Sequence, residues 1–397
     1  MRGSSQWRGR RSPFDSADRP MTFCFAAHPR RLVIAVALLL VTPVALAAGV
    51  PTSFTAGGVE YGAKGTLQYD VNRFGDDAGR FEDADDWRRQ ELYLFARKKG
   101  SFELTAGYDF EAETWGDAYL KLETAAGDFR GGQQKTLVGW EDYGYGTSST
   151  IYLERSAAEN AFYQGRRVGL EWTWNKLKNW RFALAGYSGP DLEDENEGTT
   201  FAGRVVHTPI ADDTRVLHLG ASASRERRDD GIARFRARPN AALTDVRLVD
   251  TGRMASDAID RVGLEAAWRD GPLLLQAEYL VGHNDAPSGR PDFDGRGWYA
   301  LASWALTGET RPYANAVFGN LKPTRDAGAV DVQLRYADLD LDDGVIRGGR
   351  QRDWTLGANW YWGKHLKLQA NYVWLRTERA GVTLDPEIFE ARVQVAF

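Results

Sequence analysis

Apolar and polar residues alternate along much of this chain, most clearly at its C-terminus. There Phe389, Ala391, Val393, Val395 and Phe397 form one face, and the residues between them are mostly polar. Successive side chains of a β-strand point to opposite sides of a sheet, so the spacing predicts a strand with one apolar face. Two structures fit it: the closing strand of an outer-membrane barrel, apolar toward lipid and polar toward the lumen, or the half-buried last strand of a soluble sandwich.

Further segments of the same kind recur at about the length that crosses a bilayer at a tilt, roughly 9 to 11 residues. The clearest begins at Val59 and alternates through Asn72. The others lie at residues 102–110, 168–174, 217–223, 262–268, 273–279, 330–336 and 366–374, and more weakly near 87–97, 116–123, 129–134, 180–188, 200–207, 297–305 and 354–361. The total of 16 is even and lies in the range where a barrel encloses an aqueous channel. The sequence therefore predicts an all-β, 16-stranded antiparallel transmembrane barrel.

The connections between these segments alternate in length, as they do in barrels with short periplasmic turns and longer outer loops. Two long loops, residues 135–166 and 225–260, stand out, whereas residues 306–328 form a long segment on the side where parity predicts a short turn. The tight turns lie at residues 98–100, 125–128, 175–179, 270–271 and 363–364. The predicted strand ends carry aromatic residues of the kind that forms interface girdles, namely Trp172, Trp174, Trp298, Trp304, Trp360, Trp362 and Trp374.

The N-terminal region has the parts of a secretory signal. Arg30 and Arg31 precede an apolar run from Leu32 to Ala48, and a small-residue cleavage motif ends at Ala47. We therefore expect residues 1–47 to be a signal peptide, with residues 1–20 an upstream-start artefact, and residues 48–397 to be the barrel. The expected location is the outer membrane of a Gram-negative bacterium, where a C-terminal aromatic such as Phe397 is read by the barrel-insertion machinery.

Composition excludes several other classes of protein. The chain has a net charge of −5, and residues 1–47 hold seven Arg against two Asp, so the mature chain is more acidic, at about −10. This charge disfavours nucleic acid as a partner. Cys24 is the one cysteine and precedes the predicted cleavage site. The mature chain has four histidines, none in a nucleophile motif or with metal-ligand spacing, so we expect no enzyme, metal or cofactor: they are His207, His218, His283 and His365.

The long loop at 225–260 carries the most specific chemistry. Arg234, Arg236 and Arg238 alternate with other residues, so in an extended backbone the three guanidinium groups point to the same side. If the loop folds into the barrel, they form a row that binds oxyanions bidentately in succession. If it faces outward, they form a solvated basic loop that binds lipopolysaccharide phosphates. The Arg88-Arg89 pair begins a strand, where at most one arginine lines the lumen unless the strand end is irregular.

Several segments in order resemble the phosphate- and polyphosphate-selective porins, the O and P porins. The resemblance extends from about Gly58 to Phe397, and the segments that carry it are Gly132-Gln133-Gln134-Lys135-Thr136 through Gly139-Trp140-Glu141, Leu153-Glu154-Arg155, Gly165-Arg166-Arg167-Val168-Gly169, Leu306-Thr307-Gly308-Glu309-Thr310-Arg311-Pro312-Tyr313 and Thr355-Leu356-Gly357-Ala358-Asn359-Trp360-Tyr361. It implies a homotrimer of 16-stranded barrels, two inward-folded loops and an arginine ladder that passes phosphate, pyrophosphate or polyphosphate.

Carried over residue by residue, the resemblance assigns Arg234, Arg236 and Arg238 to the ladder and Arg88 and Arg89 to a basic pair opposite it. Arg155 matches an arginine of the first inward loop, and Asp117 an acidic residue near the narrowest point. Lys135 is the one lysine in that loop, because this chain has Asp142 and Thr150 where the family has lysines. A general diffusion porin without oxyanion selectivity is therefore the alternative, and an outer-membrane barrel enzyme is the alternative from another class.

Overall fold

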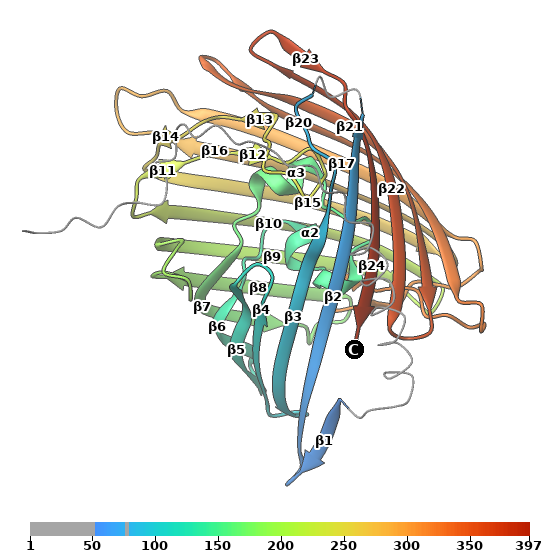
Figure 1. Ribbon diagram of the computed structural model, residues 1–397. Helices are drawn as coiled ribbons and strands as arrows, with labels where there is room; N and C mark the ends of the chain where they lie inside the picture. The colour runs from blue at the N-terminus through green and yellow to red at the C-terminus, as the bar shows by residue number, and fades with distance from the viewer. Residues whose placement is uncertain (1–51, 76–78) are drawn as a thin grey trace, which may run out of the picture. The chain divides into compact units, whose positions relative to one another are not determined.

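The computed structural model describes residues 52–75 and 79–397, and its long strands form a closed antiparallel barrel (Figure 1). The expected signal peptide, residues 1–47, lies outside the described residues. Each long strand pairs with its neighbours in sequence, and the sheet closes where β24 (Glu387–Ala396) pairs with β2 (Val59–Gly75). Every edge of the sheet is thereby paired, which is the condition for a sheet in lipid.

Each of the 16 strand segments predicted from the alternation coincides with a strand of the barrel, and two of them, 102–110 and the C-terminal segment, extend one residue past the strand. The remaining long strands are β3 (Ala84–Lys98), β4 (Phe102–Asp109), β5 (Thr114–Thr124), β6 (Gly127–Lys135), β7 (Arg166–Trp174), β8 (Trp180–Ser188), β9 (Gly198–Ala211), β10 (Arg215–Arg228), β15 (Ala258–Asp270), β16 (Leu273–Asp285), β17 (Phe293–Ala305), β20 (Ala329–Asp343), β21 (Ile346–Trp362) and β22 (Leu366–Arg379). Two short strands, β1 (Ser53–Ala56) and β23 (Val382–Leu384), pair antiparallel with β2 and β22 respectively.

The closing strand shows why the alternation has this pattern. Glu390, Arg392 and Gln394 are buried inside the barrel, whereas Phe389 on the opposite face is 41% exposed. Phe397 continues the pairing, because its carbonyl accepts a hydrogen bond from the backbone N–H of Gly65 at 3.0 Å. A Cβ at Gly65 would lie 2.5 Å from the Phe397 ring, so only glycine leaves room for that ring at the seam. The soluble-sandwich alternative is thereby excluded.

Aromatic side chains form a band on the outer surface of neighbouring strands. Ring centroids of Trp298 and Tyr336 are 5.3 Å apart, and those of Tyr336 and Trp354 are 4.8 Å apart. Trp354 is also paired across strands with Trp374. Amphipathic rings in such a row mark the level of a membrane interface, as the sequence predicted.

The helices of the described residues all belong to residues 136–165, which we call the first inward loop. They are α2 (Trp140–Tyr143), the 3-10 helix η1 (Thr147–Ser149) and α3 (Ala157–Phe162). None of the helices in the described residues is long and apolar enough to cross a membrane. Ser156 caps α3 by accepting a hydrogen bond from the Glu159 backbone N–H at 3.2 Å.

The first inward loop lies inside the barrel because its apolar residues are buried against the inner wall (Figure 1). Leu137 packs against Ala183, Ala185 and Ala202 of β8 and β9. Phe162 of α3 packs on the opposite side of the loop, in a cluster that includes wall residues of β15, β16, β17 and β20. The loop therefore narrows the interior at mid-height.

Residues 229–257, the second inward loop, also fold into the barrel. They contain the short pairs β11 (Ile232–Ala233) with β14 (Met254–Ala255) and β12 (Arg236–Ala237) with β13 (Val249–Asp250). One part of the loop is buried beside α3 and the β15–β20 wall, while Ala241 and Leu248 pack against the wall formed by β22 and β24. The backbone N–H of Leu243 donates to Asn72 of β2 at 3.0 Å. The loop thus reaches from one wall of the barrel to another.

The prediction of two inward loops is confirmed, and the structure adds a third inward segment. Residues 306–328, which include β18 (Tyr313–Ala314) and β19 (Val317–Phe318), bury Phe318 in the cluster that contains Trp140 of the first inward loop. The Trp140 indole N–H donates to the carbonyl of Ala316 at 3.1 Å, and the Asn320 amide donates to the carbonyl of Ser148 at 2.9 Å. This connection is longer than expected because it folds inward, where it supports the first inward loop through these two hydrogen bonds.

Candidate functional site

A cavity of about 280 Å³ remains between the two inward loops and the inner wall of β2, β3 and β24. We call it the central cavity. Seven basic side chains line it, Arg88, Arg89, Lys135, Arg155, Arg166, Arg238 and Arg392, against three acidic ones, Glu91, Asp142 and Glu154. Its composition is therefore opposite in sign to the chain as a whole, whose net charge is −5.

Arg88 and Arg89 both line the central cavity, although they are adjacent in a strand. The register shifts at this point, because Gln68 of β2 faces Arg89 while Tyr69 faces Trp87, which leaves Arg88 as an extra residue. Such a β-bulge turns two consecutive side chains to the same face. The exception that the sequence left open, an irregular strand, is therefore the case found here.

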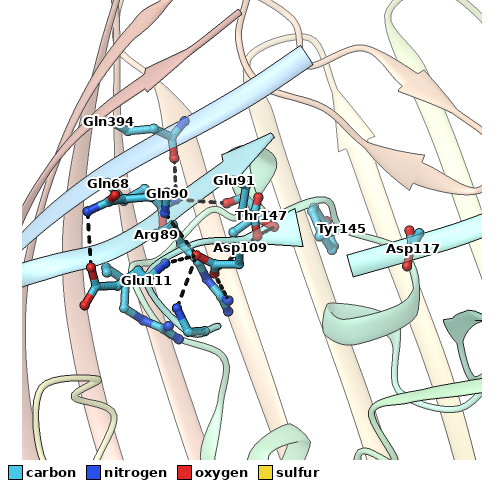
Figure 2. Close-up of polar contacts among 12 residues, drawn as sticks. Gln68, Arg89, Gln90, Glu91, Asp109, Glu111, Asp117, Tyr145, Thr147 and Gln394 are labelled. Atoms are coloured by element: carbon cyan, nitrogen blue, oxygen red, sulfur yellow. Dashed lines mark hydrogen bonds and ion pairs between the residues drawn. The ribbon is translucent and has the colours of Figure 1, made fainter. Parts of the chain in front are cut away.

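Arg89 is held in place by a network of polar groups on β2, β3 and β4 (Figure 2). Its guanidinium donates to the Asp109 carboxylate at 2.8 Å, and the same carboxylate accepts from the backbone N–H of Gln90 at 3.1 Å. Glu91 accepts a hydrogen bond from the Thr147 hydroxyl of the first inward loop at 3.0 Å. The network fixes the guanidinium in orientation and places two carboxylates beside it, Asp109 at 2.8 Å and Glu91 at 3.9 Å.

Lys135 and Arg155 converge on Asp142, which is 3% exposed. The carboxylate of Asp142 lies 2.6 Å from an Arg155 nitrogen and 3.9 Å from the Lys135 ammonium. Lys135 also donates to the carbonyls of Asp142 at 2.7 Å and Tyr145 at 2.9 Å. Although burial favours the neutral acid, Arg155 and Lys135 hold the pKa of Asp142 below its usual value. Both cations are therefore matched by one ionised carboxylate.

Arg234, Arg236 and Arg238 alternate with buried residues along the second inward loop, as the sequence predicts. Ala233, Phe235 and Ala237 are buried in the apolar cluster beside α3, and the three arginines lie on the other side of the backbone. The structure thus places the triplet inside the barrel, and not on an outward-facing loop.

The three arginines differ in their partners. Arg234 forms an ion pair with Asp250, in which its Nε donates at 2.9 Å. Within the described residues, neither Arg236 nor Arg238 has a carboxylate within 4 Å. Arg238 lines the central cavity, and its Nε is buried with no hydrogen-bond partner among the described residues.

Glu154 lies among the arginines of the cavity. Its Oε1 is 3.4 Å from the Nε of Arg88 and 3.3 Å from a terminal nitrogen of Arg392. Burial opposes ionisation, but Arg88, Arg392 and Arg238 outweigh it and lower the pKa of Glu154 to about 2. Sequence reasoning assigned no role to this residue.

Two further cations of the cavity were absent from the predicted site. Arg166 pairs with Asp117 at 2.7 Å, and Arg392 makes two contacts of 2.6 Å with Asp70. A signal for Arg392 existed, since it lies on the polar face of the closing strand, but lumenal charges are common in barrels of this size. Thr150 lines the cavity, and its carbonyl accepts a hydrogen bond from the Lys367 ammonium at 2.6 Å.

A closed barrel with loops folded into its interior around a narrow polar cavity defines the class of outer-membrane porins. Within that class, this chain belongs to the phosphate-selective porin O and P family, whose model matches residues 61–397. The resemblance read from the sequence is thereby confirmed. The chain is an outer-membrane channel.

Comparison with individual proteins agrees with this family. A protein of Caulobacter vibrioides is 30% identical over 344 residues, which is 80% of this chain and 69% of the relative. Porin O of Pseudomonas aeruginosa is 29% identical over 237 residues, so the match spans 51% of this chain and about half, 54%, of that porin. Among solved structures, OmpT, an outer membrane protein of Vibrio cholerae, superposes with a TM-score of 0.60 at 11% identity, covering 87% of this chain and 100% of OmpT. OmpT supports the fold alone.

Proposed function

We propose that this porin passes small anions through the central cavity, with phosphate, pyrophosphate or polyphosphate as the preferred class. The observation that carries the proposal is the charge of the cavity, where seven basic side chains meet three acidic ones in a chain that is acidic overall. A cluster of one sign in a narrow space of low dielectric raises the local concentration of the opposite ion. The family to which the chain belongs is named for phosphate selectivity.

In this proposal, each basic residue has a stated role. Anions are guided along the second inward loop by Arg234, Arg236 and Arg238. In the cavity the anions are surrounded by Arg88, Arg89, Arg155 and Lys135. Guanidinium groups bind oxyanions through paired N–H donors, and several weak sites in a row let an ion enter and leave. Of the three loop arginines, Arg238 lines the central cavity, and it has no carboxylate within 4 Å among the described residues.

The setting of this channel belongs to the same proposal. The expected export signal, assembly as a homotrimer and contact with lipid and lipopolysaccharide follow from the family and from the sequence pattern at residues 30–47. A general diffusion porin is the second candidate. It is favoured by Asp142, which matches both Arg155 and Lys135 and so reduces the charge that an anion meets.

Reversal potentials in planar bilayers test the proposal. With KCl at different concentrations on the two sides, we expect the purified wild-type porin to show preference for chloride over potassium, and added phosphate to block the chloride current. Arg376→Ala is a control for the loss of one positive charge away from the central cavity. Arg376 is exposed and pairs with Glu378 and Asp385 on an external hairpin. This variant should behave as the wild type. Preference for potassium, or no preference, would reject the anion channel in favour of a general porin.

A further inference from the structure

The Glu154 carboxylate lies where an anion in the central cavity would be bound. It is close to Arg88 and Arg392, at 3.4 and 3.3 Å, and all three residues line the cavity together with Arg238. These are the groups that would hold an oxyanion. The carboxylate has a charge of the same sign as phosphate and offers a pair of acceptor oxygens, as one O–P–O edge of a phosphate does.

The contacts of Glu154 are longer than those of a fixed ion pair in the same place. Arg392 makes two contacts of 2.6 Å with Asp70, whereas its contact with Glu154 is 3.3 Å. Charge-assisted N–H···O bonds are normally about 2.7 to 2.9 Å long. Asp70 is therefore the structural partner of Arg392, and the carboxylate of Glu154 is the more weakly held of the two.

The backbone around Glu154 is anchored independently of its carboxylate. The carbonyl of Glu154 accepts a hydrogen bond from Arg335 at 3.0 Å, and the carbonyl of Leu153 accepts one from Arg392 at 3.0 Å. Neither hydrogen bond involves the Glu154 carboxylate, so a change of its rotamer would break neither of them.

We propose that the Glu154 carboxylate is a tethered competitor of the transported anion, which occupies the oxyanion position among Arg88, Arg238 and Arg392 and is displaced by substrate. An oxyanion with two or more charged oxygens engages several guanidinium groups at once and displaces the carboxylate. Chloride, a single point charge, does not. Glu154 would then weaken the binding of phosphate and keep the site from holding it too tightly for release. This inference rests on the proposed function.

Substitution of Glu154 tests this, with Glu91 as a control matched in charge. Glu154→Gln keeps the size of the side chain and removes its charge from between the guanidinium groups. Glu91→Gln removes the same charge from the same cavity, at a position where one arginine lies 3.9 Å away. The measurement is the concentration of inorganic phosphate that halves the chloride current in planar bilayers.

We expect Glu154→Gln to lower the half-blocking phosphate concentration at least about tenfold, and Glu91→Gln to lower it much less. Equal effects of the two variants would mean that only the net charge matters, and would overturn the inference. An unchanged half-blocking concentration in Glu154→Gln would overturn it as well. If Glu154→Gln does not assemble, Glu154→Asp, which withdraws the carboxylate by one methylene, should also tighten phosphate block.

The two proposals fail separately. A wild-type channel without anion preference rejects the proposed function. A wild-type channel that prefers anions, combined with an unaltered Glu154→Gln variant, rejects only the role of Glu154.

Discussion

The two inward loops differ in whether their positively charged side chains are paired with carboxylates. In the first, residues 136–165, Arg155 lies 2.6 Å from Asp142, and Lys135 at the loop's base shares the same carboxylate. In the second, residues 229–257, Arg236 and Arg238 have no carboxylate within 4 Å among the described residues. Two loops that both place arginines inside the barrel therefore differ in how much unpaired charge they offer to a passing ion.

The difference teaches that partners, rather than the number of arginines, decide what an anion meets. A buried guanidinium next to an ionised carboxylate already has its electrostatic and hydrogen-bonding needs satisfied. An unpaired guanidinium facing a cavity is satisfied only by water or by an anion. We therefore expect the arginines of the second inward loop to control anion selectivity. We expect the ion pair of the first inward loop mainly to hold that loop in its folded shape.

The largest effect is expected from removal of the second loop's charges. Changing Arg234, Arg236 and Arg238 together to Ala should lower the preference for chloride in a KCl gradient, or invert it, because three positive charges leave while the barrel wall stays intact. The matched control is Arg234→Ala with Asp250→Asn, which removes an existing ion pair without changing the net charge. It should shift the reversal potential much less than the triple variant does. A triple variant that keeps the wild-type reversal potential would show that these arginines lie off the ion path.

A smaller effect, in the direction of stronger anion binding, is expected when Asp142 of the first inward loop is substituted. Asp142→Asn keeps the side chain's shape and frees Arg155 and Lys135 from their shared carboxylate. Phosphate should then block at a several-fold lower concentration, because at an effective dielectric of about 20 a charge at 4 Å contributes about 4 kcal/mol before screening. Asp142→Lys is a poorer test, since the new ammonium would lie beside Arg155. Unaltered block in Asp142→Asn would mean that the loop's cations do not face the anion.

The smallest effect is expected from pH. The pKa of Glu154 is lowered to about 2 by its arginines, so its carboxylate stays charged throughout the ordinary glutamate range and loses its charge only as the pH falls through about 2. The chloride preference, measured in KCl alone, should therefore show no step from Glu154 between pH 8 and pH 4. A step near pH 4 to 5 that is absent from Glu154→Gln would contradict the lowered pKa.

Much of the fold could be predicted from the sequence, because a barrel wall repeats one simple rule. Each strand has to present apolar residues to lipid and polar residues to the lumen, and this period of two is visible from Val59 to Phe397. Inward loops were expected from their length and from the family resemblance. The inward fold of residues 306–328 was visible only as an exception to the alternation of loop lengths.

The site was harder to predict because it depends on contacts between distant residues. Arg234 and Asp250 meet because β12 pairs with β13, which no local pattern indicates. Arg88 turns inward through a bulge that depends on the register with β2. Whether a charge is free or neutralised is a property of the folded interior, so residue type and spacing identified the arginines but not their partners.

The support of the first inward loop by residues 306–328 has a consequence for speed. A free loop of this length would sample many shapes, and ordering it would cost about 1 to 2 kcal/mol per residue at each binding event. Here Trp140 and Ser148 are hydrogen-bonded to residues 306–328, so the entropy of the loop is lost once, during folding. An ion arriving at the cavity finds its surroundings already arranged. If ions cross the channel at this cavity, as we propose, we expect diffusion and the depth of the electrostatic wells to set their transit time, because the loop needs no ordering step.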